Sequence, residues 1–405
     1  MRVEDIRLLP ENGTEATILT AVRDHRPLSR ARLFQLSGLP PATISRAAAK
    51  LLERGMLVEK RNADTSGIRA KRGLCLNPAA AAAIGIEYTP RGLNGVVVSA
   101  AYGEKCRQSR ELDLAAMGCQ AGIAAILEFA KTLVAAATSE TDRLLGIGLA
   151  DPGIVDASTG VETRSTILPG WNGVPVADTI SDAVNLPVAL MNSMSAAIRA
   201  VDRYEVPGRQ SNVIFIEYGD GVACGMKLGG RYHCGFGSRA GELGHFRISD
   251  RPVPCRCGAA GCLEALASLP SLAREAKSAL LDDSSSALAG QGDFDGNAVL
   301  AAAAAGDRLA GRVVGEAFRY LARAVAGIAN VLAPELIILD SSLARAGERA
   351  FESFEREFEL SLLDASGAGN IMLSKIGPER NALGAAFSIL DAALGENHFR
   401  QKLVN

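Results

Sequence analysis

One histidine and three cysteines gather near the middle of the 405-residue chain. His245, Cys255, Cys257 and Cys262 follow the spacing His-x9-Cys-x-Cys-x4-Cys. Thiolates and an imidazole at this spacing predict a closed tetrahedral Cys3His zinc site, whose four protein ligands leave no open position and make the metal structural. This stretch is therefore expected to fold as a tight knuckle and not as a core strand. The alternative interpretation is four unrelated side chains.

Length and composition define the molecule around this cluster. A chain of 405 residues, 48% of them hydrophobic, has material for two or three domains and is not disordered as a whole. Its apolar stretches are short and its N-terminus lacks an apolar targeting segment, so we expect a cytoplasmic protein without a membrane span. In that reducing compartment, the five cysteines outside the cluster are expected to be small buried side chains.

Charge separates the N-terminal segment from the rest of the chain. Residues 1–77 hold 14 Lys and Arg against 8 Asp and Glu, whereas the remaining residues hold 29 against 37. A basic segment beside an acidic body indicates that only the N-terminus meets a polyanion such as nucleic acid. An ordinary solvated basic surface would show the same counts.

The same N-terminal segment carries the pattern of a helix-turn-helix. Helices are predicted over 15–24, 30–37 and 42–54, with Gly38-Leu39-Pro40-Pro41 as the turn between the second and the third. In the third helix, apolar side chains recur at i, i+4 and i+7, while polar side chains occupy a different face. Such a helix is expected to lie in the major groove of DNA.

A β-hairpin wing is predicted directly after the third helix. One strand begins at residues 56–58, a polar tip follows, and a second strand returns over 74–76. Lys and Arg side chains on this hairpin are well placed to contact phosphates. The alternative is a helical bundle that binds other proteins. The predicted DNA contacts are Thr43, Ser45, Arg46 and Lys50 in the third helix and Arg61, Arg69, Lys71 and Arg72 in the wing.

From residue 79 onward, strand-like and helix-like runs alternate, which predicts an α/β fold. No internal repeat is evident in the sequence. The predicted domains are a winged helix-turn-helix at 1–78, a first α/β lobe at 79–192 that is completed by a C-terminal helix at 382–405, and a second lobe at 193–381 that contains the zinc knuckle.

Two glutamates flank the predicted zinc ligands. Glu242 lies shortly before His245, and Glu264 lies shortly after Cys262. Zinc can hold one nitrogen of the histidine ring while the other N–H meets a ligand, and carboxylates accept hydrogen bonds from hydroxyl groups. This combination suits a polyhydroxylated molecule such as a sugar. The alternative is that both glutamates only orient the zinc ligands.

The stretch from Gly241 to Ser268 closely resembles the signature of the ROK family (repressors, open reading frames and kinases). The family pattern, Gly-Glu-[Ile/Leu]-Gly-His followed by Cys-x-Cys-Gly-x-x-Gly-Cys-x-Glu, is met at every position. Residues 146–156, 168–171 and 384–386 agree with further family segments. With the predicted winged helix in front, the chain resembles the repressor branch, which includes xylose and N-acetylglucosamine repressors.

This resemblance implies a fold, an assembly and a set of site residues. The implied fold is the two-lobed actin-like, ribonuclease H-like fold of sugar kinases, and the implied assembly is a homodimer or homotetramer. The implied zinc ligands are His245, Cys255, Cys257 and Cys262, and the implied sugar contacts are Asn192, Glu242, His245 and Glu264.

Four segments differ from what a ROK kinase needs. Glu87-Tyr88-Thr89-Pro90-Arg91 stands where a glycine-containing phosphate loop is expected, and Ser193 replaces the aspartate that serves as catalytic base. Gly219-Asp220-Gly221 places a carboxylate in the second phosphate loop, and Asp340-Ser341-Ser342 replaces a glycine-rich adenosine loop. We therefore expect a body without ATPase or kinase function and without bound ATP.

Together these observations predict a repressor of carbohydrate-metabolism genes. It is expected to bind a near-palindromic double-stranded DNA operator and to respond to a sugar or sugar phosphate. Two alternatives stay open. One is an ATP-dependent sugar kinase. The other is a regulator switched by a protein partner, with a sugar site that binds nothing and residues 396–405 as a docking element.

Overall fold

The computed structural model describes residues 6, 9–61, 72–138, 143–206, 210–364 and 370–395. Contacts divide the chain into two compact units, Met1–Ala200 with Pro378–Asn405 and Val201–Gly377. The division falls inside helix α7 (Ser193–Glu205), whereas the predicted boundary at 192 lies directly before this helix. The first unit also contains the N-terminal segment, which the sequence predicts as a separate domain.

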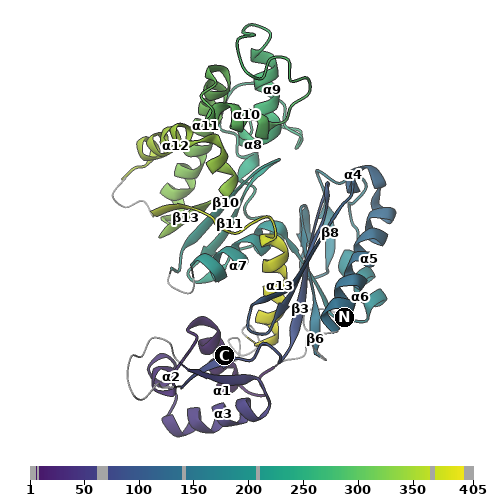
Figure 1. Cartoon of the computed structure of the whole chain (residues 1–405), viewed down its shortest axis with the longest axis vertical. Helices are drawn as coiled ribbons and strands as arrows, with labels where there is room; N and C mark the ends of the chain where they lie inside the picture. The colour runs from purple at the N-terminus through teal and green to yellow at the C-terminus, as the bar shows by residue number, and fades with distance from the viewer. Residues whose placement is uncertain are drawn as a thin grey trace. The chain divides into compact units, whose positions relative to one another are not determined.

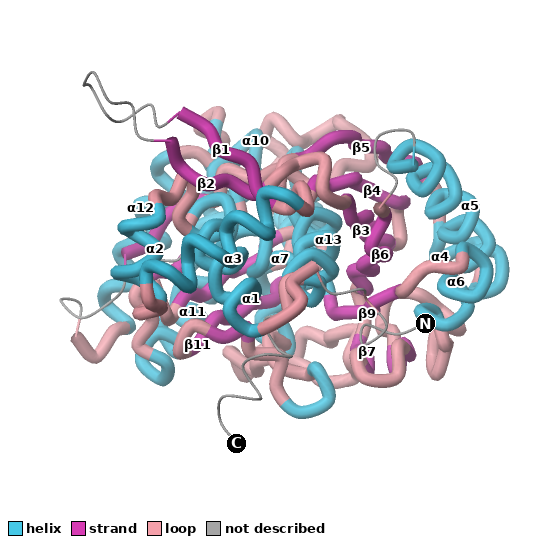
Figure 2. Tube along the Cα trace, turned by 90° about the horizontal axis from the view of Figure 1, so that it is seen from below, coloured by secondary structure: helices cyan, strands magenta, loops and turns pink. Residues whose placement is uncertain are grey.

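The N-terminal segment, called the head below, is a winged helix-turn-helix, and Figure 2 shows its hairpin beside its helices. Asn12 and Ser29 cap the first two helices by accepting hydrogen bonds from backbone N–H groups, and Gly38 ends the second helix in the left-handed conformation. Pro41 begins the third helix, where its missing N–H is not needed. The elements are α1 (Gly13–Asp24), α2 (Arg30–Ser37), α3 (Pro41–Glu53), β1 (Leu57–Arg61) and β2 (Arg72–Leu76).

The first lobe is built on the strands β3 (Ala82–Thr89), β4 (Gly92–Ser99), β5 (Glu104–Glu111), β6 (Leu144–Asp151) and β9 (Val188–Asn192). Their spatial order is β5-β4-β3-β6-β9, with the first three antiparallel and the pairs of β6 with β3 and β9 parallel. Figure 1 shows helices on both faces of this sheet. They are α5 (Cys119–Thr138), α6 (Val176–Val184) and α13 (Arg380–Ala393).

The backbone of helix α13 packs directly against the backbone of the sheet. A Cβ atom on Gly85 of β3 would lie 1.8 Å from the carbonyl oxygen of Ala382, and one on Gly148 of β6 would lie 2.1 Å from that of Ala385. On the other side of the helix, a Cβ on Gly384 would lie 1.7 Å from the carbonyl oxygen of Ala196. Three glycines thus let α13 pack closer than side chains would permit.

The second unit repeats the sheet arrangement of the first lobe. Its strand order is that of three antiparallel strands followed by two parallel ones, β12-β11-β10-β13-β14. This order, third-second-first-fourth-fifth along the chain, also describes the first lobe, and it confirms the predicted actin-like α/β fold. The elements are β10 (Val213–Tyr218), β11 (Val222–Leu228), β12 (Arg231–Tyr232), β13 (Leu336–Leu339), β14 (Asn370–Leu373), α11 (Arg308–Leu332) and α12 (Glu348–Ser361).

Short elements complete the described part of both units. They position the loops around the sheets and include the helical turns on either side of the predicted zinc knuckle. They are α4 (Leu114–Met117), β7 (Ile154–Asp156), β8 (Val161–Arg164), η2 (Phe236–Ser238), η3 (Leu243–His245), α8 (Leu263–Ala267), α9 (Leu269–Ala279), α10 (Gly296–Ala304) and η4 (Ser341–Ala346).

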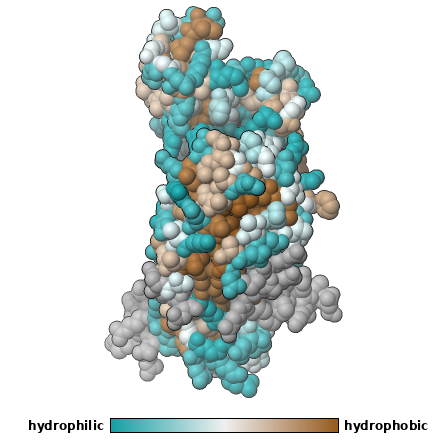
Figure 3. Space-filling model, turned by 90° about the vertical axis from the view of Figure 1, so that its right-hand side faces the viewer, coloured by the Kyte–Doolittle hydropathy of each residue, from teal (hydrophilic) through white to brown (hydrophobic). Residues whose placement is uncertain are grey.

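Helix α5 is the one described helix long and apolar enough, by composition, to cross a membrane. In the lobe it is a core helix, because Ile126, Phe129 and Leu133 are buried against the sheet. Figure 3 views the side of the first lobe that α5 covers and shows apolar side chains gathered there. Burial in the lobe accounts for part of the apolar composition of this helix, since the apolar side chains in Figure 3 lie on the outer surface. One such helix alone does not indicate a membrane span.

Candidate functional site

The four predicted metal ligands lie together in the second unit. The ligand atoms of His245, Cys255, Cys257 and Cys262 all lie within 4.8 Å of one another. The Sγ atom of Cys255 is 3.6 Å from Nδ1 of His245, and the Sγ atoms of Cys257 and Cys262 are 3.8 Å apart. The histidine therefore turns Nδ1 toward the sulfur atoms and leaves Nε2 facing away.

These separations fit a tetrahedral zinc ion. With Zn–S and Zn–N bonds of about 2.3 and 2.1 Å, a tetrahedron places two sulfur atoms about 3.8 Å apart and a sulfur and a nitrogen about 3.6 Å apart. The backbone N–H of Ala259 lowers the pKa of the Cys257 thiol, whereas burial raises the pKa of the Cys255 and Cys262 thiols. A bound metal would have to displace the protons of these two thiols. The donor set and the spacing are compatible with a metal ion bound by four protein ligands.

Two glycines allow the knuckle to close around these ligands. Gly258 and Gly261 have positive φ angles of 95° and 75°. The N–H of Gly258 donates to the carbonyl of Cys255, and the N–H of Gly261 donates to that of Val253. Because a Cβ atom on Gly261 would lie 2.1 Å from the carbonyl oxygen of Ser249, no larger residue fits there.

Glu242 lies beside the metal cluster at the start of η3. Its carboxylate is 3.8 Å from Nε2 of His245, the nitrogen that faces away from the sulfur atoms, and its side chain is 43% exposed. Glu242 thus offers a hydrogen-bond acceptor next to a ring nitrogen that can donate. This arrangement can hold a hydroxyl group of a ligand, as the sequence analysis predicts.

Glu264 forms an ion pair with Arg256, a residue that is not among the predicted site residues. Arg256 approaches it with two nitrogen atoms, Nε at 2.7 Å from Oε1 and Nη2 at 2.8 Å from Oε2. Such a bidentate ion pair balances the charge of the carboxylate and fixes its orientation. A Cβ on Gly221 would lie 2.7 Å from Oε2 of Glu264, so the pair packs against the predicted second phosphate loop. The signal that could have revealed Arg256 is its position between Cys255 and Cys257.

Asn192, the remaining predicted ligand contact, belongs to the first unit. It ends strand β9, is buried, and uses its amide locally. Its Nδ2 donates to the carbonyl of Gly153 at 2.8 Å, and its Oδ1 accepts from the N–H of Met194 at 2.8 Å. Asn192 therefore shapes the turn from β9 into α7. Its joint action with Glu242, His245 and Glu264 of the other unit stays a prediction.

A buried acidic cluster in the first lobe was not predicted. Asp151 ends β6 and Glu162 lies in β8, and both carboxyl groups are buried. The hydroxyl group of Tyr88 donates a hydrogen bond to Asp151, and the N–H of Gly153 donates to the same carboxylate at 2.6 Å. Burial raises the pKa of both acids, and the charge of Asp151 raises the pKa of Glu162 further. Glu162 is therefore protonated at neutral pH.

The segment that stands in place of a first phosphate loop is built around a carboxylate. Glu87 is buried at the end of β3. Its Oε1 accepts from Nδ2 of Asn381 at 2.6 Å, and its Oε2 accepts from Nδ2 of Asn94 at 3.1 Å. Asp340, in the predicted adenosine loop, accepts from the N–H of Ser342 and caps η4. Both acidic side chains thus have local structural roles in the segments that differ from those of a kinase.

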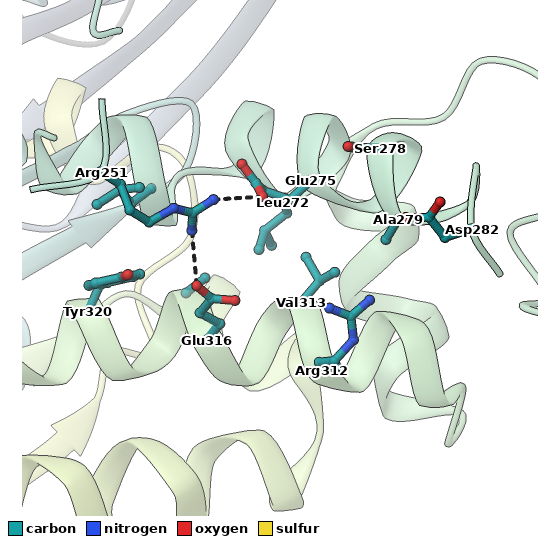
Figure 4. A pocket seen from close by; sticks show the side chains of 12 residues that line it. Arg251, Leu272, Glu275, Ser278, Ala279, Asp282, Arg312, Val313, Glu316 and Tyr320 are labelled. Carbon is teal, nitrogen blue, oxygen red and sulfur yellow. Dashed lines mark hydrogen bonds and ion pairs between the residues drawn. The ribbon is translucent and has the colours of Figure 1, made fainter. Parts of the chain in front are cut away.

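A pocket of about 220 Å³ lies elsewhere in the second unit, between α9 and α11. Figure 4 shows Arg251 in this pocket, where it bridges Glu275 at 3.3 Å and Glu316 at 2.9 Å. Its lining contains both charged and apolar side chains. Its lining includes none of the predicted metal or ligand residues, so this pocket is separate from the predicted site.

The face of α3 that is predicted to contact DNA points away from the core of the head. Ser45, Arg46 and Lys50 are exposed and Thr43 is half-buried, while the apolar residues of the helix point inward. The free face carries two cationic side chains and two hydroxyl groups, the groups that bind base edges and phosphates in a major groove.

The hairpin supplies the second predicted DNA-binding element. Arg61 and Arg72 face each other in the β1–β2 ladder, which places both at the distal end of the described hairpin. Arg69 and Lys71 lie outside the described residues, so their predicted role stays a prediction. An ion pair of 3.0 Å between Arg30 and Glu59 joins helix α2 to the hairpin.

Comparison with known proteins identifies relatives of two kinds. The model of the ROK family matches residues 115–392. A glucokinase from Halalkalibacterium halodurans is 31% identical over 61% of this chain and 76% of its own length. A xylose repressor from Bacillus subtilis is 22% identical over 92% of this chain and 94% of its own. The solved structure of a ROK-family transcriptional regulator, a homologue of the Escherichia coli Mlc protein, superposes with a TM-score of 0.80 at 23% identity and covers 96% of this chain and 98% of its own.

Proposed function

Because the chain belongs to the ROK family, we propose that it is a transcriptional repressor that binds DNA through its head. The observation that carries this proposal is the winged helix-turn-helix with a free cationic helix face, joined to a ROK body. The similarity to the xylose repressor, which extends along nearly the whole chain, supports it. The similarity to the glucokinase covers a smaller share of the chain.

The proposed operator is double-stranded and near-palindromic. In a symmetric dimer or tetramer, each head occupies one half-site, so the two-fold symmetry of the protein matches that of the DNA. The proposed place of action is the cytoplasm, where the genes of carbohydrate metabolism are accessible to the repressor.

The proposed effector is a sugar or a sugar phosphate. Glu242 and Nε2 of His245 would bind its hydroxyl groups, with Glu264 held in place by Arg256. A structural zinc ion bound by His245 and the three cysteines would fix the histidine ring in this orientation. An effector that binds one conformation of the body more tightly than the other would shift the protein between DNA-binding and released states.

We propose further that the body is not a kinase. Ser193 cannot act as the base that accepts a proton from a sugar hydroxyl near pH 7. In the segment of the first phosphate loop, Thr89 and Pro90 stand where a kinase has glycines, and Glu87 is held by Asn94 and Asn381. The similarity to a glucokinase is consistent with a shared fold, because site residues and not the fold determine activity.

Fluorescence anisotropy with DNA from the protein's own upstream region tests this function. At fixed salt, the wild type should bind this DNA in preference to a scrambled duplex, since phosphate contacts alone do not read sequence. Arg46→Ala should weaken specific binding by about 1–3 kcal/mol if Arg46 reads a guanine. Arg110→Ala, which removes a cation of β5 in the first lobe, is the matched control and should leave binding unchanged.

The outcomes separate the parts of the proposal. An equal loss for Arg46→Ala on specific and scrambled DNA would show that Arg46 contacts phosphate only. Release of DNA by one compound from a panel of sugars and sugar phosphates would identify the effector. Specific binding that no compound alters would support a protein partner as the switch, and absence of specific binding would overturn the repressor function.

A further inference from the structure

An ion pair joins the head to the last helix of the first lobe. Arg23, in the last turn of α1, places Nη1 at 2.8 Å from Oδ1 of Asp391 in α13. The two side chains are 5% and 15% exposed. The hydroxyl group of Tyr102 donates to the same oxygen at 2.6 Å. A charged pair with so little access to water is stable only while both partners are present.

One backbone hydrogen bond and one side-chain hydrogen bond join the head to the first lobe beside this ion pair. The N–H of Leu9, before α1, donates to the carbonyl of Ala393 at the end of α13, with 2.8 Å between nitrogen and oxygen. Arg26, just after α1, donates from Nη1 to the carbonyl of Ala101 in the first lobe. The head is therefore held by α13 and by the loop after β4, and the contact does not depend on a single flexible side chain.

The other end of α13 reaches the segment of the predicted first phosphate loop. There Asn381 donates to Glu87, a buried residue near the end of β3. The close glycine contacts of α13 leave it no freedom to slide on β3 and β6. As a helix of 14 residues, it spans about 20 Å between this segment and the head.

We propose that α13 and the Arg23–Asp391 ion pair form a latch that fixes the orientation of the head on the first lobe. Through this latch, a change at the Glu87 end of α13 is transmitted to the head. The effect on DNA rests on the proposed function, whereas the latch itself does not. A fixed orientation lowers the cost of binding two half-sites at once, because the heads need not be ordered on the DNA.

Arg23 has a second acidic neighbour, which provides a matched control. Its Nε lies 2.7 Å from Oδ1 of Asp24, inside the head. Asp24→Asn removes a carboxylate from Arg23 without touching α13, whereas Asp391→Asn removes the carboxylate on α13. If Arg23 mattered only for the stability of α1, the two substitutions would have similar effects.

Hydrogen exchange of the backbone amides tests the latch in the full-length protein without DNA. Asp391→Asn should speed exchange at Leu9 and along α1 by roughly tenfold, which corresponds to about 1.4 kcal/mol of lost coupling. Asp24→Asn should produce a smaller change at Leu9, and exchange in α11 should stay the same in both variants. Equal rates at Leu9 in the wild type and Asp391→Asn would overturn the proposal.

Two further measurements keep the outcome clear. Tyr102→Phe keeps the ion pair but removes one donor to Asp391, so it should give an intermediate rate at Leu9 even if Asp391→Asn folds poorly. On the upstream DNA, Asp391→Asn should bind roughly tenfold more weakly than the wild type. Faster exchange with unchanged DNA affinity would overturn the idea that the latch affects DNA binding. A wild type that binds no DNA would overturn the proposed function. In that case the exchange rates would still show whether the latch exists.

Discussion

At the scale of single residues, Glu162 gives the stability of the protein a distinctive pH dependence. Its folded-state pKa is raised above the ordinary value of 4.5 by burial and by Asp151, so the folded state takes up a proton that the unfolded state releases. Its stabilising contribution is therefore fully present below the ordinary pKa and is lost as pH rises toward the raised one. Glu162→Gln should remove this loss and raise the free energy of unfolding at pH 8 by at least about 1 kcal/mol.

Urea unfolding of both proteins at pH 5 and pH 8 measures this effect. The difference between Glu162→Gln and the wild type should shrink toward pH 5. Glu128→Gln, which changes an exposed carboxylate on α5, should follow the wild type at both values. Parallel stability curves for Glu162→Gln and the wild type would contradict a raised pKa at this position.

Substitution of a cysteine inside the cluster should change the metal content of the protein, whereas substitution of one outside it should not. Cys257→Ser should release the metal and destabilise the second unit on the order of 3 kcal/mol or more, because metal binding contributes directly to folding. Cys106→Ser, a half-buried cysteine of β5 outside the cluster, should leave the metal content unchanged. Elemental analysis of the purified proteins measures zinc directly, and a wild type that carries none refutes the metal assignment.

At the scale of elements, the sequence predicts what periodicity and spacing determine. Helix α3 follows from its apolar repeat and its proline at the first position, and the metal cluster follows from ligand spacing. Strand β5 could not be predicted in this way, because it is an edge strand whose eight residues are mostly exposed and show no alternation. The ion pair of Arg256 and Glu264 depends on the path of the knuckle relative to α8, which no local pattern encodes.

Helix α13 provides the prediction that belongs to this scale. Gly384→Ala should destabilise the first unit by more than about 4 kcal/mol or prevent folding, because its Cβ would overlap the carbonyl oxygen of Ala196 and backbone cannot yield as a side chain does. Gly311→Ala is the control, since Gly311 lies in α11 with open space around its Cβ position. It should stabilise the protein by about 0.5–1 kcal/mol, because alanine favours a helix over glycine. Thermal unfolding distinguishes the two, and a mild effect of Gly384→Ala would contradict the close packing of α13.

At the scale of the whole molecule, the same sheet order occurs in both units although no sequence repeat links them. The order depends on which runs are buried strands and how they are connected, and many different apolar residues satisfy those conditions. Sequence comparison therefore groups this chain with repressors and kinases alike. Similarity of the fold alone does not separate a repressor from a kinase, because site residues and not the fold determine activity.

Restoring the aspartate that a kinase has in place of Ser193 tests whether the kinase chemistry is lost at one position or at several. Ser193→Asp recreates the asparagine–aspartate pair and supplies a carboxylate that can accept a proton from a sugar hydroxyl. We nevertheless expect no ATP-dependent phosphorylation of glucose, N-acetylglucosamine or N-acetylmannosamine by the wild type or by Ser193→Asp in a coupled assay. The reason is that Asp220 still repels the transferred phosphate, and Thr89 and Pro90 still stand where the first phosphate loop has its glycines. Turnover by Ser193→Asp that Glu242→Ala abolishes would show that a single substitution separates this repressor body from a sugar kinase.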